Sequence, residues 1–350
     1  MSLPLVSIIV NNFNYAAYVS QAVESALAQT HPRTEVIVVD DASTDGSREI
    51  IQSFADRIVP VLRPQNGGQA AAFNAGFAAS HGDIVIFLDA DDYLYPTAAE
   101  RVVSAWGPGV GTVQYRLHVV DATGNQIEIY PDVRVPFDSG NVVPKLLATG
   151  RYVGNVTSGN AFARETLRAI FPIPEDRFRI SADGYVLTVA PFYGSVASIE
   201  SPLGAYRRHG ANQWLVAPSL LAGYQRQVAH DLAKHDVLAE RAAAFGLNVA
   251  PDAWLNEPGH VLARLGSLCL DPQHHPIASD DRFSLAVRGA RVTRRAALPW
   301  RRRTLWSMWY LCVGLLPARL AREVFLWRWD PSSRPSPLKR VLQTLGRSSH

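Results

Sequence analysis

Short apolar runs alternate with helical patterns over the first hundred residues, and this alternation limits the possible fold more than any other feature. The apolar runs have the character of strands buried on both faces; they cover residues 5–10, 35–39, 58–62 and 84–88. Helical spacing or capping residues follow the first three runs, over residues 18–29, 43–54 and 68–79. Strands that alternate with helices predict an α/β fold with a mostly parallel sheet flanked by helices.

The rest of the chain changes character twice. Residues 110–206 mix short strands and proline-marked loops, and residues 216–270 are predicted to be mainly helical. Residues 288–350 hold 14 Lys/Arg against two Asp/Glu, a charge of +12, which leaves −9 for residues 1–287. A basic tail on an acidic body is typical of a segment that meets an anionic surface.

Polar residues follow three of the predicted strands. They are Asn11 and Asn12 after the first strand, Asp40 and Asp41 after the second, and residues 89–92 after the fourth. In open α/β sheets, ligands bind beyond the carboxyl ends of the strands. We therefore expect these side chains to share one site.

The run Asp89-Ala90-Asp91-Asp92 is the strongest single signal of chemistry. Clustered carboxylates repel one another unless a cation or a proton intervenes. Oxygen ligands suit Mg²⁺ or Mn²⁺, and such a cation would neutralise charge on a departing diphosphate. The alternative is a solvated acidic turn that caps the next helix.

Asp41 is the candidate for reading a nucleobase. A carboxylate at this strand end can accept a hydrogen bond from a base N–H, a directional contact that selects the base. The neighbouring Ser43 and Asp45 are expected to cap the next helix, which leaves Asp41 for the ligand.

Four motifs in order resemble the inverting glycosyltransferases of family 2, which have the GT-A fold. They are VSIIVNNFN, VVDDASTDGS, NGGQAAAFNAG and FLDADDYL, within residues 5–95. A weaker resemblance continues to about Asn212. The resemblance implies a Rossmann-like GT-A domain at residues 1–215. The residue patterns beyond it predict a helical extension at 216–290 and a basic amphipathic segment at 291–350 with a mobile end.

The resemblance assigns roles to residues at the strand ends. Phe13 matches an aromatic residue that stacks on the base, and Asn11 stands where relatives commonly have Pro or Thr. Asp41 matches the carboxylate that reads the base. Asp92 is the favoured metal ligand, and Asp91 is assigned to the donor ribose or sugar and also to the metal.

Further donor contacts are expected from the third motif and from a loop after the catalytic segment. Asn66 and Gly68 allow close backbone approach to the donor, with Asn74 on the helix that follows. Relatives often place Arg before the residue that matches Asn74, whereas this chain has Phe73. The basic contact to diphosphate is therefore expected from elsewhere.

The loop after the catalytic segment, residues 206–212, supplies that basic contact. Arg207 and Arg208 are expected to bind the diphosphate. His209 is a candidate metal ligand, with a structural role as the alternative.

An inverting transfer needs a base that takes the acceptor proton. The segment Ser181-Ala182-Asp183-Gly184 resembles the family's acidic segment before a helix, so Asp183 is the candidate base. The alternative is that Asp183 only caps that helix. Glu175 and Asp176 are rival candidates.

The basic tail contains an apolar stretch, residues 305–316, that is too short for a span of about 20 residues. Its Arg and Trp neighbours are typical of an interfacial helix on an anionic membrane, and helices packed on the catalytic domain are the alternative. No nucleic-acid partner is expected. Residues 1–10 lack a basic signal-peptide start, and Cys269 and Cys312 fit no metal spacing, so a cytoplasmic location is predicted, peripheral on the inner membrane.

These features predict a transferase that uses Mn²⁺ or Mg²⁺. It would move a sugar from a nucleotide-sugar donor, favoured to be a UDP-sugar, to a glycan or lipid-linked acceptor in surface polysaccharide synthesis. A non-catalytic nucleotide-sugar scaffold or sensor is the alternative. A sugar nucleotidyltransferase would need a basic, glycine-rich loop after the first strand, and residues 11–15 lack both features.

Overall fold

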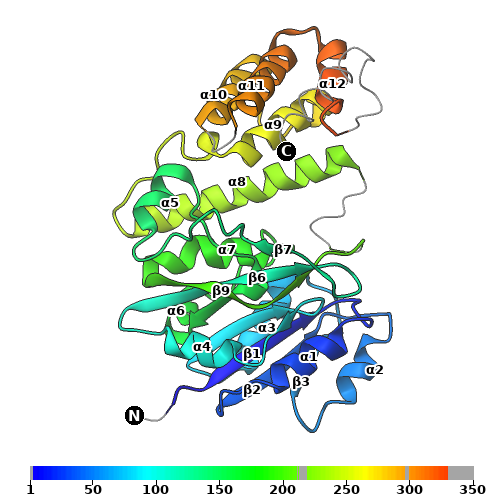
Figure 1. Cartoon of the computed structure of the whole chain (residues 1–350), viewed down its shortest axis with the longest axis vertical. Coiled ribbons are helices and arrows are strands. Elements are labelled where there is room, and N and C mark those ends of the chain that lie inside the picture. The colour runs from blue at the N-terminus through cyan, green and yellow to red at the C-terminus, as the bar shows by residue number, and fades with distance from the viewer. Residues whose placement is uncertain (1–2, 211, 213–218, 296–298, 330–350) are drawn as a thin grey trace. The chain divides into compact units, whose positions relative to one another are not determined.

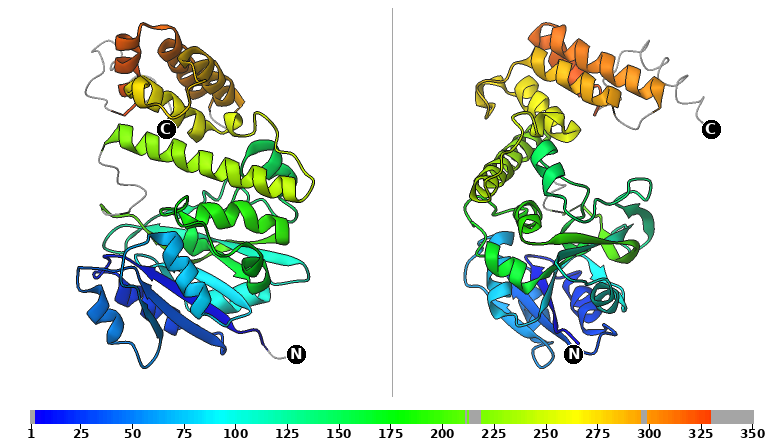
Figure 2. Two further views of the ribbon diagram at one scale, coloured as in Figure 1. Left: turned by 180° about the vertical axis from the view of Figure 1, so that it is seen from behind. Right: turned by 90° about the vertical axis from the view of Figure 1, so that its left-hand side faces the viewer.

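The computed structural model describes residues 3–210, 212, 219–295 and 299–329. The chain divides into two compact units, the first formed by Met1–Val216 with Ala233–Ala250 and the second by Ala217–Leu232 with Pro251–His350. Figures 1 and 2 show the α/β architecture of the first unit and the helices of the second.

A nine-stranded sheet forms the centre of the first unit, with strand order β3-β2-β1-β4-β8-β6-β9-β5 and β7 paired to β6. Its strands are β1 (Val6–Asn12), β2 (Thr34–Asp40), β3 (Val59–Leu62), β4 (Ile84–Asp89), β5 (Tyr93–Leu94), β6 (Val110–Val120), β7 (Gln126–Tyr130), β8 (Asn160–Ala163) and β9 (Ser195–Arg207). The α/β class and the parallel strands predicted from the first hundred residues are confirmed.

The four strands from β3 to β4 are parallel, and β1 lies between β2 and β4. The strand order reverses at β1, because the chain moves outward to β2 and β3 and then returns to add β4 on the other side. Such a reversal opens a crevice at the carboxyl ends of the strands. Asn11 pairs there with Val39 and with Asp89, so the polar strand ends lie at one level.

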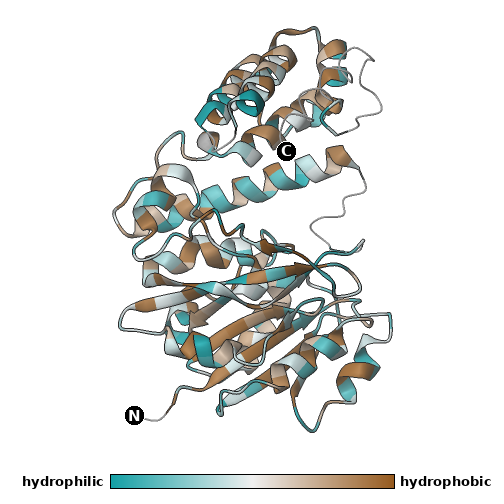
Figure 3. Ribbon diagram, in the orientation of Figure 1, coloured by the Kyte–Doolittle hydropathy of each residue, from teal (hydrophilic) through white to brown (hydrophobic). Residues whose placement is uncertain are grey.

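Helices cover both faces of this sheet. The helices α1 (Val19–Leu27), α2 (Ser47–Gln52) and α4 (Ala98–Ser104) pack in one core, and α3 (Gln69–Ala79), α6 (Arg164–Ile170) and α7 (Ala182–Val189) pack in the other. The first unit also contains α5 (Val143–Thr149). Alternate residues of β1 enter different cores: Ile8 packs with α1, and Ile9 packs with α3. Figure 3 shows these central strands as mainly hydrophobic. Burying each such side chain contributes about 1.5–3 kcal/mol.

The remaining strands bring distant segments to the same edge. β8 pairs antiparallel with β4, and the short β5 pairs antiparallel with β9, with Tyr93 opposite Ala205. The end of β9 therefore lies beside the turn that follows β4. This pairing explains why Arg207, His209 and Asn212 reach Asp91 and Asp92.

The second unit is helical among its described residues. It contains the first part of α8 (Leu220–Ala244), with α9 (Pro258–Leu270), α10 (Arg282–Arg295), α11 (Trp300–Leu315) and α12 (Ala318–Leu326). Its own core includes Tyr224, Leu265, Tyr310 and Phe325. The helical prediction for residues 216–270 is confirmed by α8 and α9. Within the described residues, no helix combines the length and apolarity needed to cross a bilayer.

Candidate active site

Asp92 lies deepest among the carboxylates after β4, with 1% of its surface exposed. Its Oδ2 accepts a hydrogen bond from the Ser158 hydroxyl at 2.6 Å, and its Oδ1 accepts one from the Arg207 backbone N–H at 2.8 Å. Both oxygens are thus engaged by the protein. These two bonds join the turn after β4 to β9, and the assignment of Asp92 as a metal ligand stays a prediction.

Asp91 faces the loop after β9. Its Oδ2 lies 3.0 Å from Nε2 of His209 and accepts a hydrogen bond from the Asn212 amide at 3.1 Å. The side chains of Asp91 and His209 are only 7% and 5% exposed. The His209 ring packs against Tyr18, with 4.8 Å between ring centroids, so its position is fixed by packing.

The strand-end carboxylates share one region of negative charge. Burial and the charge of Asp91 raise the pKa of Asp89, and Asp183 raises it further. Burial and the charges of Asp91 and Asp89 likewise raise the pKa of Asp92. A cation in this region would relieve the repulsion. Among the described residues, no group of three or more His, Cys, Asp or Glu side chains forms a complete metal site.

Two amide side chains hold Asp89. Asn11 donates to its Oδ1 at 2.9 Å and to the Leu88 carbonyl at 3.0 Å. Gln69 donates to the same Oδ1 at 3.1 Å, and its own carbonyl oxygen accepts from the backbone N–H of Ala182 at 2.8 Å. Gln69 therefore links β4 to the start of α7. The sequence analysis did not select it, although it stands in the third motif beside Gly68.

Asp183 lies in the first turn of α7, one residue beyond the helix's first residue. Its Oδ1 accepts hydrogen bonds from the Ser181 hydroxyl and the Gly184 N–H, both at 2.8 Å. The N-cap residue is Ser181, in a left-handed conformation with φ of 67°, so Asp183 does not cap the helix. The charge of Asp183 acts on both Asp89 and Tyr130. The fold therefore brings Asp183 toward the strand-end carboxylates.

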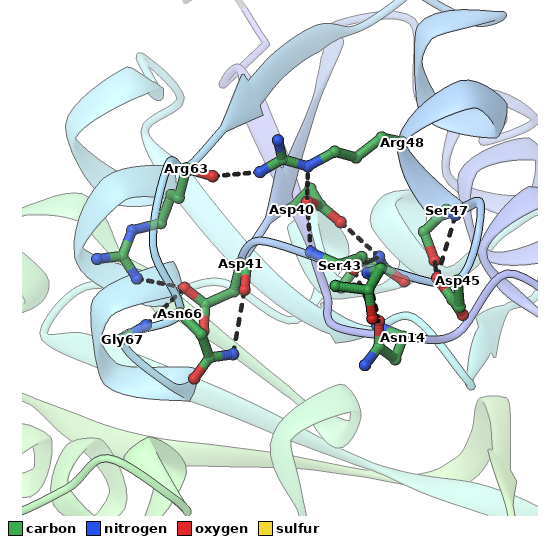
Figure 4. Close-up of polar contacts among 12 residues, drawn as sticks. Asn14, Asp40, Asp41, Ser43, Asp45, Ser47, Arg48, Arg63, Asn66 and Gly67 are labelled. Atoms are coloured by element: carbon green, nitrogen blue, oxygen red, sulfur yellow. Dashed lines mark hydrogen bonds and ion pairs between the residues drawn. The ribbon is translucent and has the colours of Figure 1, made fainter.

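Asp41 is more strongly engaged than the sequence suggests (Figure 4). Its Oδ1 accepts from Arg63 at 2.5 Å and from the Gly67 N–H at 3.0 Å, and its Oδ2 accepts from the Gly68 N–H at 2.6 Å. The expectation that capping by its neighbours leaves Asp41 unengaged is corrected, because this carboxylate organises the loop at residues 66–68.

The expectation that Ser43 and Asp45 cap the next helix is corrected, because the N-cap of α2 is Gly46, which has a φ of 87°. Asp45, just before that cap, accepts from the backbone N–H of Ser47, the first residue of α2, at 3.1 Å. Ser43 instead donates its N–H to Asp40, and Arg48 donates to the same carboxylate at 2.7 Å. Figure 4 shows this set beside Asp41. The end of β2 is thus a rigid hydrogen-bonded platform.

Other predicted donor contacts serve the fold in this structure. Asn74 binds the backbone of Ile173 through both its amide nitrogen and oxygen, at 3.0 and 2.8 Å, and its amide also reaches Glu175 at 3.0 Å. Asn66 accepts from Arg179 at 2.5 Å. Asn74 and one rival base, Glu175, are therefore tied to each other.

Arg207 is held by contacts within the protein. It is 4% exposed, and its guanidinium donates to the backbone carbonyl of Asp91 at 2.9 Å and to the Gln21 side chain at 2.6 Å. It also lies over the Tyr18 ring, 4.9 Å from the centroid. These contacts use its Nε and one terminal nitrogen, and its assignment to the diphosphate stays a prediction. Arg208 is 40% exposed and forms an ion pair with Glu128 at 2.5 Å.

Phe13 is half-buried directly after β1. The structure thus brings together Asn11, Asp91, Asp92, Asp183 and His209 around the end of β4. The Asp41 loop lies at the end of the adjacent β2. The arrangement can hold a charged ligand between a set of carboxylates and a histidine, with Asp183 available to take a proton.

Comparisons with known proteins agree with this architecture. The model of the family "Glycosyl transferase family 2" matches residues 7–164. An uncharacterized glycosyltransferase of Nostoc sp. is 39% identical over 220 residues, which cover 61% of this chain and 68% of that protein. The putative teichuronic acid biosynthesis glycosyltransferase TuaG of Bacillus subtilis is 44% identical over 92 residues, 25% of this chain and 36% of TuaG.

Two solved structures share the fold. A mannosyltransferase from Pyrobaculum calidifontis, in complex with GDP-Man and Mn²⁺, matches with a TM-score of 0.52 and 20% identity, over 93% of this chain and 86% of that one. TarS 1–349 of S. aureus, in complex with UDP-GlcNAc, matches with a TM-score of 0.51 and 16% identity, over 93% and 91%.

The fold is therefore that of the GT-A glycosyltransferases. The chain belongs to glycosyltransferase family 2, and it is a glycosyltransferase. The alternatives of a nucleotidyltransferase or a non-catalytic sensor find no support among these relatives.

Proposed function

We propose that this chain is an inverting, divalent-metal-dependent glycosyltransferase that moves a sugar from a nucleotide diphosphate sugar to a glycan or lipid-linked acceptor. The acceptor would belong to cell-surface polysaccharide synthesis, on the cytoplasmic face of the membrane. The observation that carries the proposal is the meeting of Asp91, His209 and the Asp183 charge around the end of β4.

The residues present fit a divalent cation. One carboxylate oxygen and one imidazole nitrogen lie 3.0 Å apart in a negatively charged region, and Mn²⁺ accepts both ligand types. We assign the cation to Asp91 and His209, with phosphate oxygens and water as its other ligands. When bound, it would neutralise the charge of the leaving diphosphate. The mannosyltransferase with GDP-Man and Mn²⁺ supports a metal in this fold.

Asp183 would act as the general base. The acceptor hydroxyl oxygen attacks the anomeric carbon, the bond from that carbon to the phosphate oxygen breaks, and the nucleoside diphosphate leaves with the electron pair. The acceptor proton passes to the Asp183 carboxylate. A single displacement of this kind inverts the anomeric centre.

A uridine-linked donor is favoured, with Phe13 stacking on the base. The UDP-GlcNAc complex of TarS supports that choice, and the GDP-Man complex keeps guanosine donors in the test panel. TuaG, named for teichuronic acid biosynthesis, supports a surface-polysaccharide acceptor.

The test is a thermal-shift panel of nucleoside diphosphates and nucleotide sugars, with and without Mn²⁺. We expect one nucleotide to raise the Tm only with the metal, and Asp91→Asn to abolish that effect. Asp183→Asn should keep the shift and lower the transfer rate by about 10²–10⁴-fold. Metal-independent stabilisation, or full transfer by Asp183→Asn, would overturn the corresponding assignment.

A further inference from the structure

A pocket of about 260 Å³ lies on the second unit, between the end of α10 and the outer side of α11. Its wall combines two arginines, Arg294 and Arg303, with the apolar side chains of Trp300, Met308 and Leu311. No acidic residue is among the described residues that line it. The pocket is remote in sequence from every residue assigned to sugar transfer.

The two arginines leave their charge available to a ligand. Neither forms an ion pair with any described residue, and Arg303 donates a hydrogen bond to the Arg294 backbone carbonyl, which holds the two close together. Two cations at one pocket repel each other until an anion binds between them. Guanidinium groups bind phosphate in a bidentate manner.

An exposed apolar stripe adjoins these arginines. Trp300, Met308 and Leu315 are 66%, 59% and 69% exposed, and their spacing of eight and seven residues places them on one face of α11. The opposite face packs inward through Tyr310 and Val313. An exposed stripe beside cations is the pattern of a helix that lies in the interface of an anionic membrane.

The surrounding charge points to the same partner. Residues 288–329 contain ten arginines and one glutamate. Basic groups near an anionic lipid surface each strengthen binding. The basic residues, the pocket and the exposed apolar stripe of α11 therefore lie in the same region of α10 and α11.

We propose that this pocket binds the phosphate headgroup of an anionic membrane lipid, with Arg294 and Arg303 on the phosphate and the α11 stripe in the interface. The inference adds a defined lipid site to the membrane location in the proposed function, and it does not depend on the transfer chemistry.

The test uses the full-length protein and vesicles of phosphatidylcholine, alone or mixed with phosphatidylglycerol. We expect binding only to the mixed vesicles. The double variant Arg294→Gln/Arg303→Gln should bind about 30-fold or more weakly, since each arginine at the surface contributes about fivefold. Trp300→Ala should also weaken binding.

The control is Arg319→Gln/Arg322→Gln on α12, which removes the same charge outside the pocket. We expect a clearly smaller loss, and equal losses in the two double variants would overturn the pocket. Binding of inorganic phosphate by a protein that does not bind vesicles would contradict the lipid and identify a soluble anion as the ligand. A dimer that Trp300→Ala weakens would identify a second copy of the chain as the occupant instead.

Transfer to a soluble acceptor without vesicles separates the two proposals. Both double variants should retain it, along with the wild-type Tm. Weaker vesicle binding by Arg294→Gln/Arg303→Gln with intact transfer would support the lipid site, whereas unchanged vesicle binding by that variant would refute the lipid site and leave the transferase proposal standing.

Discussion

At the scale of single residues, several polar side chains of this site form hydrogen bonds to the protein's own backbone and side chains. Arg207 supports the Asp91 backbone and the Tyr18 ring, and Asn74 supports the backbone at Ile173. Their residue types suit phosphate or sugar, so sequence reasoning assigned them to the donor. A sequence does not reveal which carbonyl groups the fold places within reach of a donor, and this explains both differences.

Gln69 is a positioning residue whose loss should affect transfer more than donor binding. Gln69→Leu removes the link between Asp89 and the N–H of Ala182, so the start of α7 and Asp183 lose their fixed position. A misplacement of about 1 Å can lower a rate by 10²-fold. We expect kcat to fall by one to two orders of magnitude while the metal-dependent Tm shift remains.

The matched control is Gln52→Leu, at an exposed position of α2. It should leave kcat unchanged. If Gln69→Leu weakened donor binding by the same factor as it lowered kcat, Gln69 would contact the donor itself.

Glu35 gives the first unit a pH-dependent contribution to stability. Burial acts to raise its pKa, but hydrogen bonds from Ser7 and from the backbone and side chain of His81 outweigh it, so the pKa is lowered. A lowered folded-state pKa adds stability above the ordinary pKa of the group, and that stability is lost as pH falls through the folded-state value.

Glu35→Gln should therefore lower the free energy of unfolding by about 1–3 kcal/mol at neutral pH, because a neutral amide oxygen accepts these hydrogen bonds less strongly than the carboxylate does. The difference from the wild type should shrink below about pH 4.5. Urea unfolding at several pH values measures it, with the exposed Glu24→Gln as control. If the difference in unfolding free energy between the variant and the wild type stayed constant down to acid pH, the Glu35 charge would not be its cause.

At the scale of elements, the loop before α3 is shaped by one close contact. Gly68 has φ of 82°, and a Cβ built there would lie 2.2 Å from the Arg179 carbonyl oxygen. The same loop gives its N–H groups to Asp41. A side chain at position 68 would separate the loop from Arg179.

Gly68→Ala should therefore destabilise the protein by more than about 1–3 kcal/mol, because a φ of 82° with a ψ of −175° is a backbone conformation that essentially only glycine adopts, and the new Cβ would also clash with Arg179. It should also weaken donor binding. Gly124→Ala is the matched control, since Gly124 has φ of 93° and open space around its Cβ position. Thermal unfolding of the two variants separates the clash from the backbone strain, and equal Tm losses would exclude the clash.

The elements also show where sequence reasoning succeeds. β1, β2 and β4 were predictable because each is a local apolar run that ends in polar residues, and those polar ends mark the site. The pairing of β5 with β9 was not predictable, because it joins residues more than a hundred positions apart through backbone groups. That pairing places His209 beside Asp91, so the histidine's partner became visible only in the fold.

At the scale of the whole molecule, the two units have separate hydrophobic cores. The second unit also contains a buried contact between a histidine and a carboxylate, with His260 Nδ1 2.8 Å from Asp231 Oδ2 and both side chains at most 6% exposed. A buried carboxylate that loses its partner destabilises a fold strongly. We therefore expect this pair to contribute to the stability of the second unit and to take no part in sugar transfer.

His260→Leu should lower the free energy of unfolding of the second unit by about 1–3 kcal/mol, because the buried Asp231 loses its imidazole partner while it keeps the Gln227 amide. His274→Leu is the control: His274 lies 2.8 Å from Asp271 but is 75% exposed, so no measurable change is expected. Tryptophan fluorescence suits the measurement, since Trp254 lies 6.1 Å from the His260 ring. If the metal-dependent nucleotide shift survives in His260→Leu while this fluorescence transition moves to lower denaturant, the units carry separable stability. Loss of both together would mean that donor binding requires the intact helical unit.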